Sequence, residues 1–294
     1  MKGRTRIAPT PSGFLHLGNL YSFVYTYLLA QQEDLEIMLR IDDMDQGRMR
    51  MEYLDDIFRS LESLGLDYQL GPSGPSDLVE NWSQLKRRNE YDSLLERLKD
   101  DEALYPCRCT RQELATHNQS EHFAKNCWSK KEAFARNGQK WRLKYQGEEV
   151  DILNWQGEAE ESALTEEVWD FAIRKKNGDP AYQLCSYSDD LHFGISHIVR
   201  GADLIPSSYA QAYLAKILQD ERFRKMRFLH HPLVKYEGEK LSKSQSAPAA
   251  KYYLGGRINR QRVLNFIARE LGLEGSFSVL EDLREAYLER EGLG

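Results

Sequence analysis

The segment Arg4-Thr5-Arg6-Ile7-Ala8-Pro9-Thr10-Pro11-Ser12-Gly13-Phe14-Leu15-His16-Leu17-Gly18-Asn19 contains the strongest fold signal in the chain. Its pattern predicts a short strand, a turn rich in proline and glycine, and a helix that begins near His16. A helix N-terminus presents unpaired backbone N–H groups and a positive dipole end, which suits phosphate. Gly13 and Gly18 leave room for a nucleotide near the backbone, and His16 can donate a hydrogen bond to a phosphoryl oxygen without carrying a fixed charge.

A second motif, Lys240-Leu241-Ser242-Lys243-Ser244, lies far along the sequence. It sets two lysines among hydroxyl side chains, which suits a loop that closes over a triphosphate and neutralises charge in the transition state. Taken alone, each motif is common, because turns of this kind precede helices in many α/β proteins and short lysine-rich segments are usually solvated. The two motifs together, in this order, favour nucleotide activation.

Both motifs resemble the HIGH and KMSKS signatures of class I aminoacyl-tRNA synthetases. The flanking segments Arg6–Gly13 and Leu39–Asp45 resemble the corresponding segments of glutamyl-tRNA synthetases. The resemblance implies an α/β fold with a Rossmann-type catalytic domain, with ATP and glutamate as substrates and Mg²⁺ as the counter-ion of ATP. It assigns the ATP site to His16, Gly18, Asn19, Lys240 and Lys243.

The amino-acid pocket follows from the charges of an acidic amino acid. Two carboxylates call for guanidinium groups, and the ammonium calls for a carboxylate. The family usually has glutamate at the position of Asp42, and the shorter side chain would reach the amine through water or after a backbone shift. Without the resemblance, an arginine in a strand is more often part of a structural ion pair, and Tyr182 is more often a packing residue. By resemblance, the glutamate site comprises Arg6, Ile7, Ala8, Pro9, Thr10, Asp42, Tyr182 and Arg200.

The length of 294 residues and the hydrophobic content of 41% predict a main domain with a substantial insertion. We expect the first half of the catalytic domain over 1–104, an inserted segment over 105–142, the rest of the insertion and the second half of the catalytic domain over 143–244, and a short helical tail without an anticodon-binding domain over 245–294. Hydrophobic periodicity predicts helices over Leu17–Ala30, Met51–Leu64, Gln84–Lys99, Pro206–Gln219, Arg260–Leu271 and Leu280–Glu289. It predicts strands over Glu36–Ile41, Trp141–Tyr145, Asp170–Arg174, Ala181–Ser186, Phe193–Val199 and Phe228–Val234.

Three of the four cysteines, Cys107, Cys109 and Cys127, lie close together in the inserted segment. They offer three soft ligands for a structural zinc ion, which needs a fourth ligand to complete a tetrahedron. His122 is the nearest candidate and His117 the next. The short relatives in the family typically place the fourth ligand at the position of Phe123, which cannot bind zinc. A water ligand, a degenerate site and three unmetallated cysteines all stay open as alternatives, and Cys185 is expected to be a core residue in a strand.

Composition narrows the setting of the protein. The net charge of −6 argues against non-specific binding of nucleic acid but allows a local basic groove. The sequence has neither a run of about 18 apolar residues nor a cleavable apolar leader. Cysteines clustered as in a metal site indicate a reducing compartment. We therefore expect a cytoplasmic protein with no membrane contact and infer no protein partner.

The stretch after Ser244 has room for two helices, whereas helical anticodon-reading domains follow the catalytic half of bacterial glutamyl-tRNA synthetases. The chain thus resembles the short paralogues of that family, the glutamyl-Q tRNA(Asp) synthetases. This implies a ligase that forms glutamyl-adenylate and transfers glutamate to queuosine at the wobble position of tRNA(Asp). Two alternatives are a minimal glutamyl-tRNA synthetase that charges the 3′ end of tRNA(Glu), and a catalytically silent paralogue that binds RNA or protein.

Overall fold

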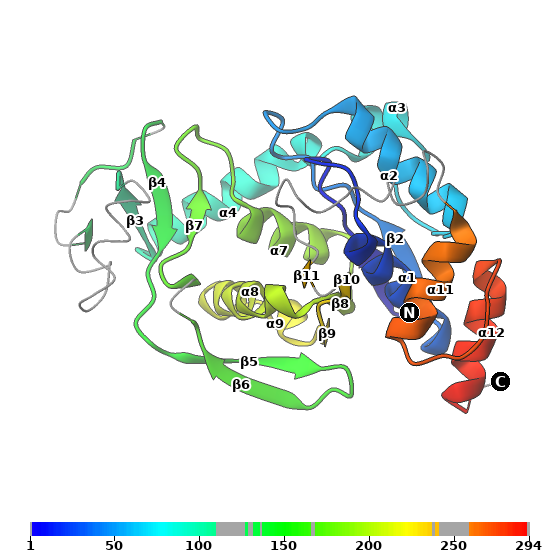
Figure 1. Ribbon diagram of the computed structural model, residues 1–294. Helices are drawn as coiled ribbons and strands as arrows, with labels where there is room; N and C mark the ends of the chain where they lie inside the picture. Colours follow the sequence, from blue (N-terminus) through cyan, green and yellow to red (C-terminus); the bar gives the residue numbers. More distant parts are fainter. Residues whose placement is uncertain are drawn as a thin grey trace. The chain divides into compact units, whose positions relative to one another are not determined.

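The computed structural model describes residues 2–109, 127–128, 132–135, 137–165, 168–236, 239–240 and 259–292 (Figure 1). These residues form two compact units, each built from segments that are distant in the sequence. Unit 1 comprises Met1–Gln84, Ile195–Asp203 and Phe228–Gly294, and unit 2 comprises Leu85–Gly194 and Leu204–Arg227.

Unit 1 is built around a short parallel sheet. Strand β1 (Arg4–Ile7) pairs in parallel with β2 (Glu36–Leu39), and helix α1 (Leu17–Gln32) connects them. Strand β8 (His197–Gly201) lies on the other side of β1, because the backbone N–H of Ser196 donates to the carbonyl oxygen of Arg4 at 2.9 Å. Strand β9 (Arg227–His231) is the neighbour of β8. A parallel pair joined by a crossover helix is the core of a Rossmann-type fold, as the sequence predicts.

Helix α1 covers this sheet because its apolar side chains return every three to four residues. Leu20, Val24 and Leu28 are fully buried along one stripe of the helix. The next helix, α2 (Met51–Leu64), has the same spacing and ends at Gly65, which adopts the left-handed conformation that glycine accepts without strain. Gly71 is required for another reason: a Cβ there would lie 2.2 Å from the carbonyl oxygen of Leu39, next to the end of β2.

The tail helices belong to unit 1. Helices α11 (Arg260–Glu270) and α12 (Leu280–Arg290) confirm the two helices predicted after the lysine motif. Both contact α1. The hydroxyl of Tyr287 on α12 donates to the side-chain oxygen of Gln32 at 3.1 Å. Other elements described in this unit include α3 (Pro75–Asp77), a helical turn at Leu78–Trp82, β10 (Lys235–Tyr236) and β11 (Glu239–Lys240).

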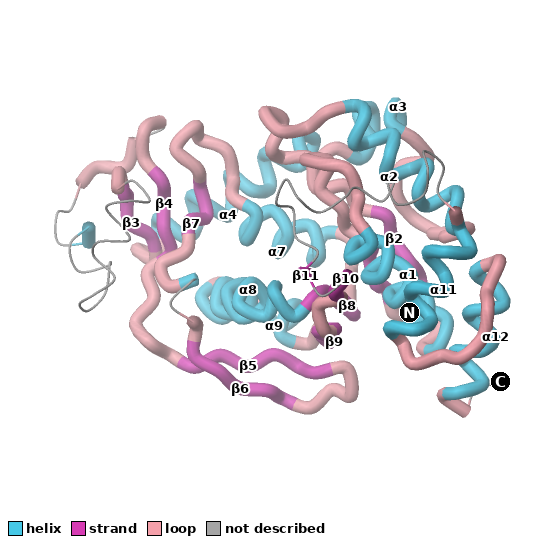
Figure 2. Tube along the Cα trace, in the orientation of Figure 1, coloured by secondary structure: helices cyan, strands magenta, loops and turns pink. Residues whose placement is uncertain are grey.

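Unit 2 combines helices with antiparallel strands (Figure 2). Strands β3 (Leu104–Cys107), β4 (Lys140–Leu143) and β7 (Ala172–Arg174) form a three-stranded sheet, and β5 (Glu149–Asn154) and β6 (Ala159–Ala163) form a hairpin. The helical part consists of a turn at Gln84–Arg87, α4 (Arg88–Asp100), α7 (Tyr182–His192), α8 (Ile205–Ile217) and α9 (Glu221–Arg224).

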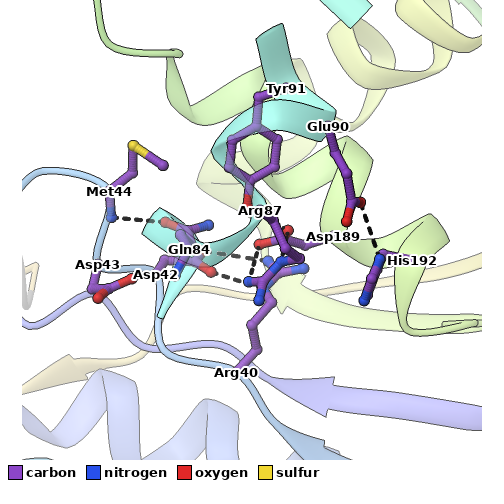
Figure 3. A network of polar contacts seen from close by, with 10 residues as sticks. All are labelled: Arg40, Asp42, Asp43, Met44, Gln84, Arg87, Glu90, Tyr91, Asp189 and His192. Atoms are coloured by element: carbon purple, nitrogen blue, oxygen red, sulfur yellow. Dashed lines mark hydrogen bonds and ion pairs between the residues drawn. The ribbon is translucent and has the colours of Figure 1, made fainter. Parts of the chain in front are cut away.

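A buried polar cluster fastens α7 to α4 within unit 2. The guanidinium of Arg87 forms two bonds to the carboxylate of Asp189, at 2.8 and 3.1 Å, and the hydroxyl of Tyr91 donates to the same carboxylate at 2.6 Å (Figure 3). Asp189 is fully buried. Because a buried carboxylate is costly unless it is paired, this cluster specifies how the two helices meet.

Two strand predictions were wrong in whole or in part. Ala181–Ser186, predicted as a strand, is the beginning of α7, so Cys185 is buried in a helix. The short pattern of this segment fits either structure. The strand predicted over Phe193–Val199 begins only at His197, because Phe193 caps α7 and Gly194 turns the chain with a φ of 64°.

No helix in the described part of the chain is both long enough and apolar enough to cross a membrane.

Candidate functional site

The N-terminus of α1 is organised by a reciprocal pair of hydrogen bonds. The backbone N–H of Asn19 donates to Nδ1 of His16 at 3.3 Å, and the backbone N–H of His16 donates to the side-chain oxygen of Asn19 at 3.1 Å. These bonds form a capping box in which histidine is the N-cap residue. A neutral imidazole has one protonated nitrogen, so Nδ1 as the acceptor assigns the proton to Nε2. His16 thus has an Nε2–H donor at a helix end suited to anions.

Gly18 allows His16 to occupy this position. A Cβ at Gly18 would lie 3.1 Å from two atoms of the His16 imidazole and 3.6 Å from Cγ2 of Val234. A side chain there would press on the capping histidine. The turn before the helix is held separately, because the backbone N–H of Leu15 donates to the carboxylate of Asp56 on α2 at 2.9 Å.

The lysine motif is only partly described. Lys240 is the last residue of the short hairpin formed by β10 and β11, where only the backbone is described. Lys243 lies outside the described residues. The assignment of both lysines to the triphosphate therefore stays a prediction.

The strand ends of unit 1 bring together most of the residues predicted for the glutamate site. The parallel ladder continues past β1 and β2, because the N–H of Arg40 donates to the carbonyl of Ile7 and the N–H of Asp42 donates to the carbonyl of Pro9, both at 2.9 Å. The segment Ile7–Thr10 therefore lies beside Asp42. Arg6 joins β8 from the same strand end, where its Nη1 donates to the carbonyl of Val199 at 3.2 Å.

Three buried arginines define the charge of this region. Arg6, Arg40 and Arg200 are 5%, 2% and 3% exposed, and they stand at or next to the carboxyl ends of β1, β2 and β8. The guanidinium of Arg200 also lies over the ring of Phe228, 5.6 Å from its centre. Ligands of parallel α/β sheets bind at this edge. Guanidinium groups gathered here suit an anionic ligand, above all one with carboxylates.

Arg40 was missed in the sequence reasoning, although a signal existed. Its Nε and Nη2 contact the two carboxylate oxygens of Asp42 at 2.7 and 3.3 Å (Figure 3). Residues two apart in an extended segment face the same side, so Arg40-Ile41-Asp42 directly after a strand predicts such a pair. The carboxylate proposed to bind the amine is thus buried beside a guanidinium.

A second missed group, Asp43 and Gln84, holds the loop after β2. The carboxylate of Asp43 accepts from the Ser83 hydroxyl at 2.6 Å and from the Gln84 N–H at 2.7 Å. In return, the side-chain oxygen of Gln84 accepts the N–H of Met44 at 2.8 Å. We call Asp43, Met44, Ser83 and Gln84 the loop clasp. No local pattern could have predicted it, because its two halves are far apart in the sequence.

Tyr182 belongs to unit 2 and so shares no unit with the arginines. It is the first residue of α7 and is 41% exposed, which leaves its ring and hydroxyl accessible. The assignment of Tyr182 to the glutamate site stays a prediction.

The three clustered cysteines meet in unit 2. The sulfur atoms of Cys109 and Cys127 are 3.5 Å apart, those of Cys127 and Cys107 are 3.9 Å apart, and all three lie within 4.8 Å of one another. Sulfur atoms bound to one tetrahedral zinc at about 2.3 Å would be about 3.8 Å apart, so the cluster fits zinc. Burial raises the pKa of Cys107, but the Arg142 guanidinium and hydrogen bonds from Cys109 together hold the pKa below its usual value, which favours the thiolate that binds metal.

The fourth zinc ligand falls in a part of the chain without described positions. His122, His117 and Phe123 all lie outside the described residues. The identity of the fourth ligand, whether a histidine, water or none, therefore stays a prediction.

Comparisons with known proteins identify the family of this chain. A family model described as tRNA synthetases class I (E and Q), catalytic domain, matches residues 2–276. A glutamyl-Q tRNA(Asp) synthetase from Nitratidesulfovibrio vulgaris is 30% identical over 294 residues, covering 93% of this chain and 88% of that protein. A glutamate–tRNA ligase from Burkholderia thailandensis is also 30% identical, over 288 residues, covering 90% of this chain and 57% of that protein. The chain thus spans little more than half the length of the second relative.

Solved structures show the same fold at lower identity. The crystal structure of a glutamate tRNA ligase from Elizabethkingia meningosepticum in complex with its amino acid matches 97% of this chain and 64% of that one, with a TM-score of 0.71 and 22% identity. The glutamate-tRNA synthetase of Elizabethkingia anophelis matches 83% of this chain and 53% of that one, with a TM-score of 0.64 and 24% identity.

Proposed function

Because this chain belongs to the class I tRNA synthetase (E and Q) catalytic-domain family, a family of ligases, we propose that it activates glutamate with ATP and transfers it to queuosine in tRNA(Asp). The observation that carries the first half of this proposal is the pair of buried arginines at the strand ends, Arg6 and Arg200, next to the ion pair of Arg40 with Asp42. Glutamate brings two carboxylates, and guanidinium groups pair with carboxylates through two parallel hydrogen bonds.

Glutamate binding uses groups from several strand ends. Arg6 and Arg200 pair with substrate carboxylates, and Asp42 pairs with the ammonium. The segment Ile7–Thr10 lines the site, and Tyr182 contributes its hydroxyl. A neutral or basic side chain on the substrate would not form the two parallel hydrogen bonds that a carboxylate forms with a guanidinium. The site therefore favours an acidic amino acid.

In the first step an oxygen of the glutamate α-carboxylate attacks the α-phosphorus of ATP, and pyrophosphate leaves. His16 donates from Nε2, and Gly18 and Asn19 keep the first turn of α1 open to the phosphates. Lys240 and Lys243 neutralise charge on the triphosphate, and a Mg²⁺ ion bound with ATP would add positive charge there. In the second step a hydroxyl of the acceptor attacks the carbonyl of the mixed anhydride, and AMP leaves. No enzyme nucleophile is needed, because the chain contributes positioning and charge.

The second half of the proposal is the acceptor, queuosine in tRNA(Asp). Its support is the glutamyl-Q tRNA(Asp) synthetase of N. vulgaris, most of whose length this chain matches. The cyclopentene diol of queuosine resembles the ribose diol used in ordinary charging, so the same adenylate could serve both. A splayed wobble base is also the kind of target that proteins take from RNA loops. The second candidate, charging of tRNA(Glu), is supported by the B. thailandensis relative.

Two measurements test the function. Glutamate-dependent exchange of pyrophosphate into ATP tests activation, and a silent RNA- or protein-binding paralogue would give none. Transfer of labelled glutamate is then compared on tRNA(Asp) with queuosine, tRNA(Asp) without it and tRNA(Glu), followed by nuclease mapping of the labelled fragment. We expect label only in the anticodon loop of the queuosine-containing tRNA. Label at the 3′ end of tRNA(Glu) would establish the second candidate instead.

We also propose that Cys107, Cys109 and Cys127 hold one zinc ion with His122 as the fourth ligand. Such an ion would hold the β3 end and the inserted segment together and would take no part in adenylation. The reaction uses tRNA and ATP, and the proposed zinc site needs reduced cysteines, so we expect the protein in the cytoplasm.

A further inference from the structure

We infer that Arg40 is a positioning residue that sets the affinity for the amino group of the substrate, acting through Asp42. The inference rests on the proposed function, because it takes Asp42 as the group that binds the substrate ammonium. Nothing in the sequence reasoning assigned a role to Arg40.

Arg40 holds the carboxylate of Asp42 at both of its oxygens. The Arg40 guanidinium contacts both oxygens of Asp42, at 2.7 and 3.3 Å, and the side chains are 2% and 6% exposed. The planar fork of arginine fixes the orientation of a carboxylate, which a single ammonium group does not do.

Hydrogen bonds fix the backbone on both sides of Asp42. The N–H of Arg40 is bound to Ile7, and the N–H of Asp42 is bound to Pro9. The loop clasp holds the next two residues through Gln84. With the backbone held, the main freedom left to Asp42 is rotation of its short side chain. Arg40 removes this freedom, which is what positioning requires.

The chain contains a matched control at the opposite end of the same two strands. Arg4 also contacts a carboxylate through its Nε and Nη2, that of Glu36 at 3.1 and 2.6 Å. That pair is about one-third exposed and lies at the amino ends of β1 and β2. Replacing Arg4 by lysine makes the same chemical change away from the proposed site.

The test compares Arg40→Lys with Arg4→Lys in binding and exchange. The probes are glutamate and glutarate, a dicarboxylate that lacks the amine. Lysine keeps the charge but loses the fork, so we expect Arg40→Lys to weaken glutamate binding about tenfold, the order expected when one hydrogen bond to a charged group is weakened. Glutarate binding and the KM for ATP should stay at the wild-type values. Arg4→Lys should change none of these quantities.

The binding and exchange results bear separately on the role of Arg40 and on the proposed reaction. Unchanged glutamate affinity in Arg40→Lys overturns the inference, and so does an equal loss of glutarate affinity, which would mean that Arg40 supports the carboxylates or the whole pocket. If the wild-type chain binds glutamate but does not support exchange, the proposed reaction fails while the binding comparison still decides the role of Arg40. If it binds neither probe, both claims fail.

A double-mutant cycle covers the case in which Arg40→Lys folds poorly. Asp42→Asn removes the charge that Arg40 holds, so the double variant contains no unpaired buried carboxylate. If Arg40 acts only through Asp42, the double variant should bind glutamate no more weakly than Asp42→Asn alone. An additive loss of affinity would overturn the inference. Thermal denaturation of each variant shows that folded proteins are being compared.

Discussion

Gly18→Ala tests the organisation of the ATP end of the site. The added methyl would lie 3.1 Å from two atoms of the His16 imidazole, closer than the 3.5 to 4.0 Å that carbon contacts prefer. The ring must therefore move away. The bond from Asn19 N–H to Nδ1 is already 3.3 Å long, at the outer end of the normal range, so a small movement breaks it.

Gly18→Ala should lower the exchange activity much more than it changes the stability. Loss of an N-cap bond costs about 1 kcal/mol, whereas replacing glycine by alanine inside a helix gains about 1 kcal/mol. The two effects offset each other, so we expect the melting temperature to stay within about 3 °C of the wild type. His16 loses its fixed orientation, and misplacement of such a group lowers the rate by up to about 100-fold. Pyrophosphate exchange at saturating glutamate, measured against ATP concentration, reports this loss.

Gly13→Ala is the control within the same motif. A Cβ at Gly13 meets no atom within 4 Å, and its φ is not in the left-handed region. The variant should keep the wild-type melting temperature and the His16 cap, so any loss of exchange in it measures crowding of the nucleotide alone. An exchange rate in Gly18→Ala no lower than that in Gly13→Ala would refute the reasoning about His16.

Four further predictions address other groups. Lys243→Ala should lower exchange by about 100-fold or more without unfolding the protein, and a normal rate would remove Lys243 from the phosphate site. Arg200→Leu should abolish exchange with glutamate, because it leaves a substrate carboxylate desolvated and unpaired; normal exchange would make Arg200 structural. Elemental analysis should find about one zinc per chain, and Cys109→Ser should lower both the zinc content and the melting temperature, whereas metal-free native protein would indicate a degenerate site. Burial raises the pKa of Asp170 to about 6, so the stability that this group contributes is lost as pH rises from about 4 to about 7. Asp170→Asn should therefore become more stable relative to the wild type over that range, as measured by denaturation at each pH. An equal dependence of stability on pH in both proteins would contradict the raised pKa.

The sequence by itself determined the local elements around the nucleotide motif. The alternation of Arg4–Ile7, the proline and glycine turn and the apolar spacing of α1 each lie within a short window, so turn chemistry and periodicity were sufficient to predict them. The tail helices were predicted for the same reason. The segment Ala181–Ser186 shows where this reasoning ends, because a short apolar run satisfies either a strand or a helix until its packing is known.

The tertiary structure alone decided which distant residues meet. Placing β8 beside β1 gathers Arg200 with Arg6, and the loop clasp joins Asp43 to Gln84 across a long stretch of chain. The same holds for the three cysteine sulfurs, whose spacing in the sequence did not establish their distance in space. Such contacts depend on how the chain returns to its own sheet, which no short window of sequence records. Local sequence therefore specified the chemical groups of the site, and long-range packing specified their geometry.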